Sequence, residues 1–496
     1  MHVKTPPFSK VLIANRGEIA CRIVRTLREM GIVSVAVHHE SEAGARHVAI
    51  ADEAFEIEGA TPVAAHLDGV AMIEIARRCG AEAVHPGYGF LSENAGFARA
   101  VMDAGLVFIG PDAETIQLMG DKIRARAFAQ TQGVPVAPSV TPTEDVDAFM
   151  ARAQAIGFPL LIKAAAGGGG KGMSIVRSSG ELRERIRIAA SEAERYFADG
   201  RIYAERYIDR PRHIEVQILG DGRGGAVHLF ERECSVQRRF QKVIEECPSA
   251  GLAPALRREI CEAGVRLARA AHYRNAGTIE FMLAPDGAFH FLEMNTRLQV
   301  EHPVTEMVTG IDLVRRQIEI AAGDGLPLAQ EAVAVRGHSI ECRICAEDPE
   351  RDFMPETGRI LAVEVPAAPY LRFENGLVAR QAVTSNFDSM LAKLVVHGAD
   401  RNEAIERMAA ALSELTILGV KTNIDYLGRL IRLSAFARGE LHTGFIVEHA
   451  GELALRAGEE RERDLALIAA ALRFPEFRSL AFDVPDPYAA MGQWRN

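Results

Sequence analysis

The sequence predicts a mixed α/β protein, α+β overall, whose N-terminal part is an open parallel sheet. Strand-like and helix-like segments alternate through residues 10–109, which is typical of parallel strands joined by helices. A glycine-rich loop follows an apolar strand at residues 164–173, and a charged β-hairpin occupies residues 278–294. A hairpin requires antiparallel strands, so we expect the chain to combine a parallel sheet with an antiparallel domain.

Hydrophobic periodicity and helix-capping residues predict the N-terminal elements. They are a strand at Lys10–Asn15, a helix at Glu18–Met30 ended by Gly31, strands at Ile32–Val37, Ala81–Val84 and Leu106–Ile109, and a helix with Ser92 as its N-cap. The turn at residues 15–18 contains one glycine, whereas a dinucleotide-binding turn contains three. We therefore expect the nucleotide to bind elsewhere, and an NAD-dependent oxidoreductase is disfavoured.

The glycine-rich loop is the first candidate for phosphate binding. Residues Pro159 to Lys163 predict a buried strand that ends in a lysine, and the loop runs from Ala164 to Met173. Successive glycine N–H groups can surround a phosphate, and lysines add positive charge. The spacing matches neither a Walker A loop nor a GxGxxG turn. A flexible linker is the alternative, which the lysine at the end of the strand argues against.

The charged hairpin is the candidate metal site. Residues Thr278–Leu283 and Ala288–Met294 predict two strands joined by a turn at 284–287. If the turn closes symmetrically, Glu280 has an odd-numbered partner, and alternation places Glu293 and Asn295 on its face. Hard cations such as Mg²⁺ prefer these oxygen ligands. The alternative is an edge hairpin with solvated charges.

Two charged residues follow the hairpin directly. Arg297 can bind a small oxyanion through two N–H groups, and Glu301 can accept a proton. Their position next to the expected metal ligands argues against the edge-hairpin alternative.

Length and composition limit the class of protein. With 496 residues, of which 48% are hydrophobic, the chain can form a large core and two to four domains. A net charge of −10 disfavours a nucleic-acid partner. No signal peptide and no run of 18 apolar residues is evident, so we expect no membrane partner and a cytoplasmic location. Seven scattered cysteines predict reduced thiols, and the Cys342–Cys345 pair lacks a second pair to complete a zinc site.

Taken together, these segments resemble the ATP-grasp ligases, and within them the biotin carboxylases. The resemblance covers residues 8–449 and rests on motifs at residues 14–19 (ANRGEI), 85–94 (HPGYGFLSEN), 119–122 (MGDK), 162–173 (IKAAAGGGGKGM), 233–239 (ECSVQRR), 241–243 (QKV), 293–302 (EMNTRLQVEH) and 341–343 (ECR). It implies an N-terminal domain at 1–120, an ATP-grasp domain at 121–331 with a mobile lid at about 135–207, a mixed α/β C-terminal domain at 332–449 and a helical tail at 450–496.

The resemblance also implies the role of individual residues. The ligands would be ATP, Mg²⁺ or Mn²⁺, bicarbonate and biotin. Lys122, Lys163, Gly169 and Gly170 would contact the nucleotide phosphates, Glu205 with Arg206, Tyr207 and Ile208 the adenine, and His213 and Gln237 the ribose and phosphates; Glu280, Glu293 and Asn295 would hold the metal; Arg297, Lys242, Gln299 and Val300 would bind bicarbonate, Glu301 would be the base, Arg343 would stabilise the biotin enolate, and Tyr88 and Arg22 would border the biotin pocket.

The implied reaction is carboxylation of biotin through carboxyphosphate, the first half-reaction of an acyl-CoA carboxylase. No lysine of the sequence lies between two methionines, so we expect a biotin carboxyl carrier protein or domain to supply biotin. A carboxyltransferase subunit and a homodimer or larger complex are further expected partners. The front portion of a pyruvate carboxylase, a carbamoyl phosphate synthetase-like ligase and a purine-pathway ligase are the competing enzymes.

One departure from the family pattern concerns the nucleotide. Phe240 stands where the pattern usually has a polar residue, and a phenyl ring cannot donate a hydrogen bond to a phosphate. We therefore expect weaker ATP binding, and a catalytically weakened scaffold subunit is the alternative from another functional class.

Overall fold

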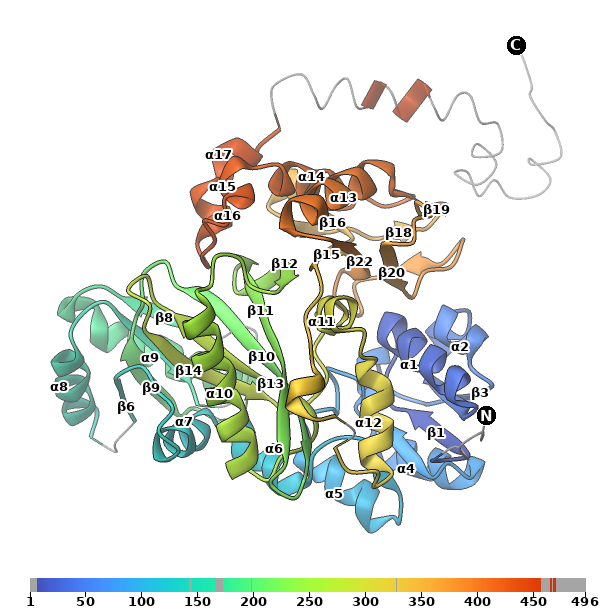
Figure 1. Cartoon of the computed structure of the whole chain (residues 1–496), viewed down its shortest axis with the longest axis horizontal. Helices are drawn as coiled ribbons and strands as arrows, with labels where there is room; N and C mark the ends of the chain where they lie inside the picture. Colours follow the sequence, from blue (N-terminus) through green and yellow to red (C-terminus); the bar gives the residue numbers. More distant parts are fainter. Residues whose placement is uncertain are drawn as a thin grey trace.

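The fold was analysed in a computed structural model that describes residues 7–141, 145–165, 173–197, 199–326, 328–455, 464–465 and 467–469. Figure 1 shows a parallel sheet near the N-terminus, a small sheet with two helices at the opposite side, and a large central sheet between them. The predicted mixed α/β class is confirmed. None of the helices in the described part of the chain has the length and apolar character that a membrane span requires.

The N-terminal sheet is parallel throughout, as predicted. Its strands lie in the order β3 (Glu53–Glu56), β2 (Val33–His38), β1 (Lys10–Ile13), β4 (Ala83–His85), β5 (Val107–Phe108). The accompanying helices are α1 (Gly17–Met30), η1 (Glu40–Glu42), α2 (Arg46–Ile50), α3 (Pro62–His66), α4 (Gly69–Cys79), α5 (Ala95–Asp103) and α6 (Ala113–Gly120).

Two capping predictions in this part of the chain had different outcomes. Gly31 ends α1 in the left-handed conformation, with φ 70°, as predicted. The prediction that Ser92 caps the next helix is wrong. Asn94 is the N-cap of α5, and its side chain accepts a 2.9 Å hydrogen bond from the backbone N–H of Phe97. Ser92 instead lies in the preceding turn, where its backbone N–H donates to the carbonyl of Gly89.

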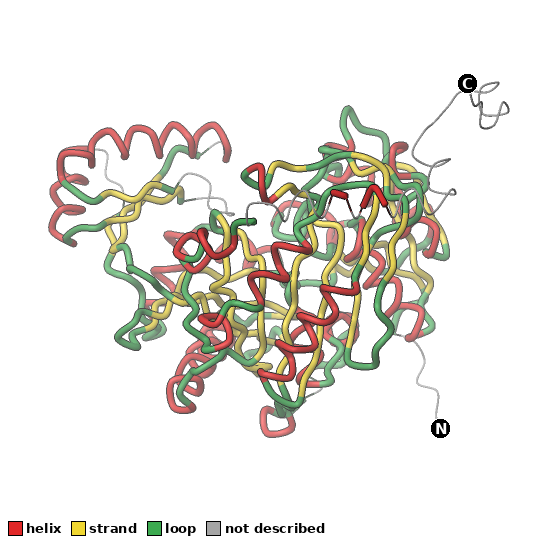
Figure 2. Tube along the Cα trace, turned by 90° about the horizontal axis from the view of Figure 1, so that it is seen from above, coloured by secondary structure: helices red, strands yellow, loops and turns green. Residues whose placement is uncertain are grey.

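A small antiparallel sheet extends from the main body (Figure 2). The strand order is β6 (Ser139–Val140), β9 (Ile202–Arg206), β7 (Leu160–Ala164), β8 (Ser174–Val176), and the helices nearby in the chain are α7 (Lys122–Thr131), α8 (Val146–Ile156) and α9 (Ser179–Phe197). The predicted strand that ends in a lysine is β7, and all five of its residues are buried. The glycines after it, Gly169 and Gly170 included, lie outside the described residues.

The large sheet has eight antiparallel strands. Their order is β14 (Phe289–Asn295), β13 (Arg274–Leu283), β10 (Arg212–Asp221), β11 (Ala226–Arg238), β12 (Gln241–Cys247), β15 (His338–Cys345), β22 (Met390–Gly398), β20 (Leu371–Asn375). The pairing of β12 with β15 joins the segments before and after residue 331 in one sheet. Helices α10 (Pro254–Ala270), α11 (His302–Thr309) and α12 (Leu313–Ala321) pack against it.

The C-terminal segment adds short strands and helices beside β15 and β22. They are η2 (Gln330–Ala332), β16 (Glu347–Asp348), η3 (Pro349–Arg351), β17 (Met354–Pro355), β18 (Gly358–Arg359), β19 (Ala362–Glu364), β21 (Ala382–Val383), α13 (Arg401–Glu414), β23 (Thr416–Leu418), α14 (Ile424–Ile431), α15 (Ser434–Ala437), α16 (Phe445–Glu448) and α17 (Ala450–Leu453). One apolar cluster runs from β15 and β22 to α13, α14 and α16, so this segment packs as one body with the end of the large sheet.

Candidate active site

A cavity of about 490 Å³ lies between the small sheet and the large sheet. Most of the residues singled out from the sequence line it, although they come from segments far apart in the chain. These are Tyr88, Lys122, Lys163, Glu205, Arg206, Tyr207, Ile208, His213, Gln237, Lys242, Glu280, Glu293, Asn295, Arg297, Gln299, Val300 and Arg343.

The predicted pairing within the charged hairpin is confirmed, but a bulge produces it. Glu280 lies opposite Glu293, while its neighbour Phe281 lies opposite Phe291, so the pairing skips Leu292. Without this bulge the register of the turn would place Glu280 opposite Leu292 and turn Glu293 to the other face. The extra residue therefore brings both carboxylates to the same face of the sheet.

Glu280 is the most heavily hydrogen-bonded carboxylate of the site. One oxygen accepts hydrogen bonds from Lys242 and Asn295, both at 2.9 Å, and from Gln299 at 3.1 Å. The other oxygen lies 2.9 Å from Nε2 of His213. Burial opposes ionisation of Glu280, but the positive charges nearby outweigh it and hold the pKa well below its ordinary value.

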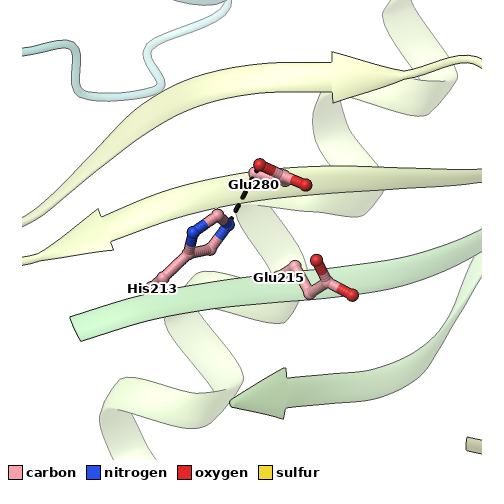
Figure 3. Close-up of side chains that lie close together, drawn as sticks. All are labelled: His213, Glu215 and Glu280. Atoms are coloured by element: carbon pink, nitrogen blue, oxygen red, sulfur yellow. Dashed lines mark ion pairs between the residues drawn. The ribbon is translucent and has the colours of Figure 1, made fainter. Parts of the chain in front are cut away.

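A second carboxylate on β10, Glu215, was missed from the sequence. His213 and Glu215 extend from the same strand toward Glu280 on the neighbouring strand (Figure 3). Glu215 is fully buried and accepts hydrogen bonds of 2.5 Å from both Lys242 and Arg232. The two-residue spacing in the segment His213-Ile-Glu215 could have revealed it, because alternate residues of a strand share a face.

The far end of the cavity holds paired lysines and glutamates. Lys163 lies 2.5 Å from Glu205, whose other oxygen lies 2.9 Å from Arg126. Lys122 forms a 2.9 Å ion pair with Glu293. Burial opposes ionisation of Glu205, but Lys163 and Arg126 outweigh it and lower its pKa. Two lysines that face the cavity with a carboxylate partner each can bind a polyphosphate if those contacts rearrange.

Glu301 precedes α11 and is fully buried. One carboxylate oxygen lies 2.6 Å from the Lys242 ammonium, and the other accepts a 2.9 Å hydrogen bond from Arg343. Burial opposes ionisation, but Lys242, Arg343 and Arg232 outweigh it and hold the pKa of Glu301 well below its ordinary value. The group is therefore an ionised carboxylate at neutral pH, ready to accept a proton.

Arg297 is held in place by neighbours on three sides. Its guanidinium donates hydrogen bonds of 2.9 Å to Glu93, Asn295 and Gln299. Glu93 belongs to the segment at residues 85–94 and was not predicted as a site residue. The arrangement fixes the plane of the Arg297 guanidinium, as bidentate recognition of a small oxyanion requires.

The two residues expected beside biotin lie in different places. Tyr88 lines the cavity, and its hydroxyl donates a hydrogen bond to Glu18. Arg22 does not line the cavity. Its side chain is 2% exposed and donates hydrogen bonds of 2.9 Å to Glu306 and Asp312. Arg22 thus belongs to a buried ion cluster, and we do not assign it to the biotin pocket.

Phe240 lines the cavity from the turn between β11 and β12. Arg239 and Phe240 both have positive φ, 50° and 67°, which is the geometry of a two-residue type I′ turn. The ring is 50% exposed, so it presents an apolar surface where nucleotide phosphates or sugar could lie.

Three family models match consecutive parts of the chain. They are the biotin carboxylase N-terminal domain over residues 7–116, the carbamoyl-phosphate synthase L chain ATP binding domain over residues 121–329, and the biotin carboxylase C-terminal domain over residues 341–448. Together they cover most of the chain in the order that the sequence resemblance implied.

Similar proteins agree with these matches. The methylcrotonoyl-CoA carboxylase subunit alpha of Rattus norvegicus is 46% identical over 90% of this chain, which spans 63% of that relative. The biotin carboxylase of Halalkalibacterium halodurans is 48% identical over 89% of this chain and 98% of its own length.

A solved structure adds ligands to the comparison. The biotin carboxylase domain dimer of the Hydrogenobacter thermophilus 2-oxoglutarate carboxylase, in complex with MgADP, ADP and bicarbonate, has a TM-score of 0.88 and 44% identity over 90% of this chain and 99% of that one. On the family models, the relatives and the fold together, the chain belongs to the biotin carboxylase family of ATP-dependent ligases.

Proposed function

We propose that the chain catalyses the ATP-dependent carboxylation of biotin with bicarbonate, by way of carboxyphosphate. The observation that carries the proposal is the buried, ionised carboxylate of Glu301, which contacts Lys242 and Arg343 at the wall of the cavity. The same cavity holds Lys122 and Lys163 for phosphates. A base beside an anion site and a polyphosphate site is the arrangement that this reaction needs.

ATP would lie between the two sheets. Lys122 and Lys163 would exchange their carboxylate partners for phosphate oxygens, and β9 with the chain to Ile208 would flank the adenine. Glu280, Glu293 and Asn295 fit Mg²⁺ or Mn²⁺, because their oxygen-bearing side chains lie together on one face of the hairpin. A cation bound there would offset negative charge on the phosphates.

Bicarbonate would bind between Arg297, Lys242, Gln299 and the backbone of Val300. Glu301 would then accept the bicarbonate proton, and the resulting dianion would attack the γ-phosphorus of ATP as ADP leaves. Arg297 and Lys242 would offset the charge that builds up on the reacting oxygens. Carboxyphosphate would break to CO₂ and phosphate, the phosphate would take the ureido proton of biotin, and Arg343 would stabilise the enolate oxygen.

The proposed partners follow from the reaction. Biotin would come on a carrier protein or domain, a carboxyltransferase would use the product, and the chain would act as a homodimer or within a larger complex. The cytoplasm is the proposed compartment. We propose an acyl-CoA as the final acceptor. Pyruvate is the alternative, because the relatives named above carry different acceptors in their names.

The test is an assay of ADP release with ATP, Mg²⁺ and bicarbonate, with and without free biotin. We expect ADP formation that depends on both bicarbonate and biotin and that stops when Mg²⁺ is chelated. ADP formation that is insensitive to both substrates would contradict the proposal. A chain that binds a biotin carrier but forms no ADP would be a scaffold subunit instead.

A further inference from the structure

A pair of buried glutamates lies beside the proposed base. Glu245 on β12 and Glu341 on β15 are direct partners in the large sheet. Side chains of directly opposed residues point to the same face, with Cβ atoms roughly 5 Å apart. Both residues are fully buried. The sequence analysis assigned no role to either of them.

The hydrogen bonds of this pair are unevenly distributed. Arg343 donates from Nε to one oxygen of Glu245 at 2.6 Å and from Nη2 to Glu301 at 2.9 Å. No described residue donates a hydrogen bond to the second oxygen of Glu245 or to either oxygen of Glu341. The nearby Lys393 uses its ammonium on Glu18, at 3.1 Å, and on the carbonyl of Val300, at 2.8 Å.

Two ionised carboxylates cannot stand side by side here without large cost, because water is excluded and one guanidinium already serves Glu245 and Glu301. Burial raises the pKa of Glu245 to about 7 although Arg343 opposes the shift. Burial and the charge of Glu245 raise the pKa of Glu341 well above its ordinary value. The charged groups that act on Glu341 are Glu245, Glu301, Arg343 and Lys393.

We propose that Glu341 carries a proton at neutral pH and is a positioning residue for Arg343. As a neutral acid it leaves the guanidinium shared between Glu245 and Glu301, next to the cavity. Loss of the proton at alkaline pH would create a third carboxylate beside Arg343 and draw the guanidinium away from Glu301. The effect on turnover rests on the proposed function, whereas the protonation of Glu341 does not.

Infrared spectroscopy of the whole chain tests the protonation directly. We expect a carbonyl band of a protonated, buried carboxylic acid at neutral pH that is lost in Glu341→Gln and that disappears from the wild type on alkaline titration. Glu246→Gln is the matched control, because Glu246 is the next residue of β12 and is paired with His338 and Arg401. It should keep the band. A wild type without a titrating band, or a band that persists in Glu341→Gln, would overturn the proposal.

The pH profile tests the positioning role. The alkaline decline of kcat should move to higher pH by at least about one unit in Glu341→Gln, since the glutamine cannot ionise. Glu246→Gln should keep the wild-type profile. An unshifted decline in Glu341→Gln would overturn the positioning role. Absence of biotin-dependent turnover in every variant would instead contradict the proposed function, and the infrared result would still decide the state of Glu341.

Discussion

At the scale of single residues, Glu301 shows how buried cations prepare a base. Lys242 and Arg343 keep the carboxylate ionised and fix both of its oxygens. The geometry leaves Glu301 no freedom to turn away, so an anion that binds at Lys242 meets an oriented acceptor. This arrangement separates proton transfer from nucleotide binding, because neither lysine at the far end of the cavity contacts Glu301 in the hydrogen bonds described above.

Substitution of Glu301 by glutamine should therefore lower turnover without weakening nucleotide binding. Glutamine keeps the shape but cannot accept the proton, so we expect kcat to fall by about 100-fold or more. Kinetics with calorimetric titration of ATP would measure both effects. Glu231→Gln is the control, since Glu231 is equally buried and pairs with Arg257 away from the cavity. A Glu301→Gln enzyme with wild-type kcat would remove Glu301 from the mechanism.

Phe240 is the residue where this chain can gain affinity. Its half-exposed ring lines the cavity and offers no hydrogen bond to a phosphate. A hydrogen bond to a charged group contributes about 1.5–3 kcal/mol, so Phe240→His should lower the KM for ATP by about tenfold or more. ATP saturation curves at fixed bicarbonate and biotin would measure the change.

Phe240→Asn is the matched variant, because asparagine also tolerates the positive φ of this turn but is shorter. If asparagine and histidine lower KM equally, relief of turn strain rather than contact with the nucleotide explains the gain. Curves indistinguishable from the wild type would mean that Phe240 is a tolerated packing change.

The residues that sequence reasoning found and those it missed differ in kind. Glu280, Glu293, Arg297 and Glu301 lie within one short segment, so spacing alone indicated shared chemistry. Glu215, Glu245 and Glu93 act through partners more than 25 residues away in the chain, such as Lys242, Arg343 and Arg297. Strand register and helix packing create these contacts, and neither can be derived from local composition.

At the scale of elements, local signals predicted strands and turns well and helix starts less well. Gly31 was found because a left-handed residue at a helix end favours glycine. Ser92 was chosen over Asn94 because both are good N-cap residues and the sequence between them gives no further signal. The bulge at Leu292 was not predicted, since an extra residue in one strand is visible only when the partner strand is known.

Two glycine-to-alanine substitutions should have opposite effects on stability. Gly31 has φ 70°, so Gly31→Ala should destabilise α1 by about 1 kcal/mol. Gly120 ends α6 without a positive φ, and an added Cβ would meet no atom within 4 Å, so Gly120→Ala should stabilise by up to about 1 kcal/mol. Urea unfolding midpoints would compare the variants. A destabilised Gly120→Ala protein would contradict this account.

At the scale of the whole molecule, ion pairs and a shared sheet join parts that the sequence divided. The expected boundary at 331/332 falls between strands of one eight-stranded sheet, because β12 pairs with β15. The proposed active site depends on that pairing, since it places Arg343 of β15 beside Glu301. Domain limits inferred from motifs mark where family patterns change, whereas strand pairing decides which segments fold as one body.

The N-terminal sheet is joined to the rest through the ion cluster of Arg22. This arginine of α1 is 2% exposed and pairs with Glu306 of α11 and with Asp312, the N-cap of α12. Arg22→Ala would leave these carboxylates without a buried partner, which should cost about 3–5 kcal/mol of unfolding free energy. Arg25, one turn further along α1, is 44% exposed and pairs with Glu374, so Arg25→Ala should cost at most about 1 kcal/mol. Thermal and urea unfolding of the two variants would measure the difference. Equal losses would mean that burial of the Arg22 cluster does not hold the N-terminal sheet in place.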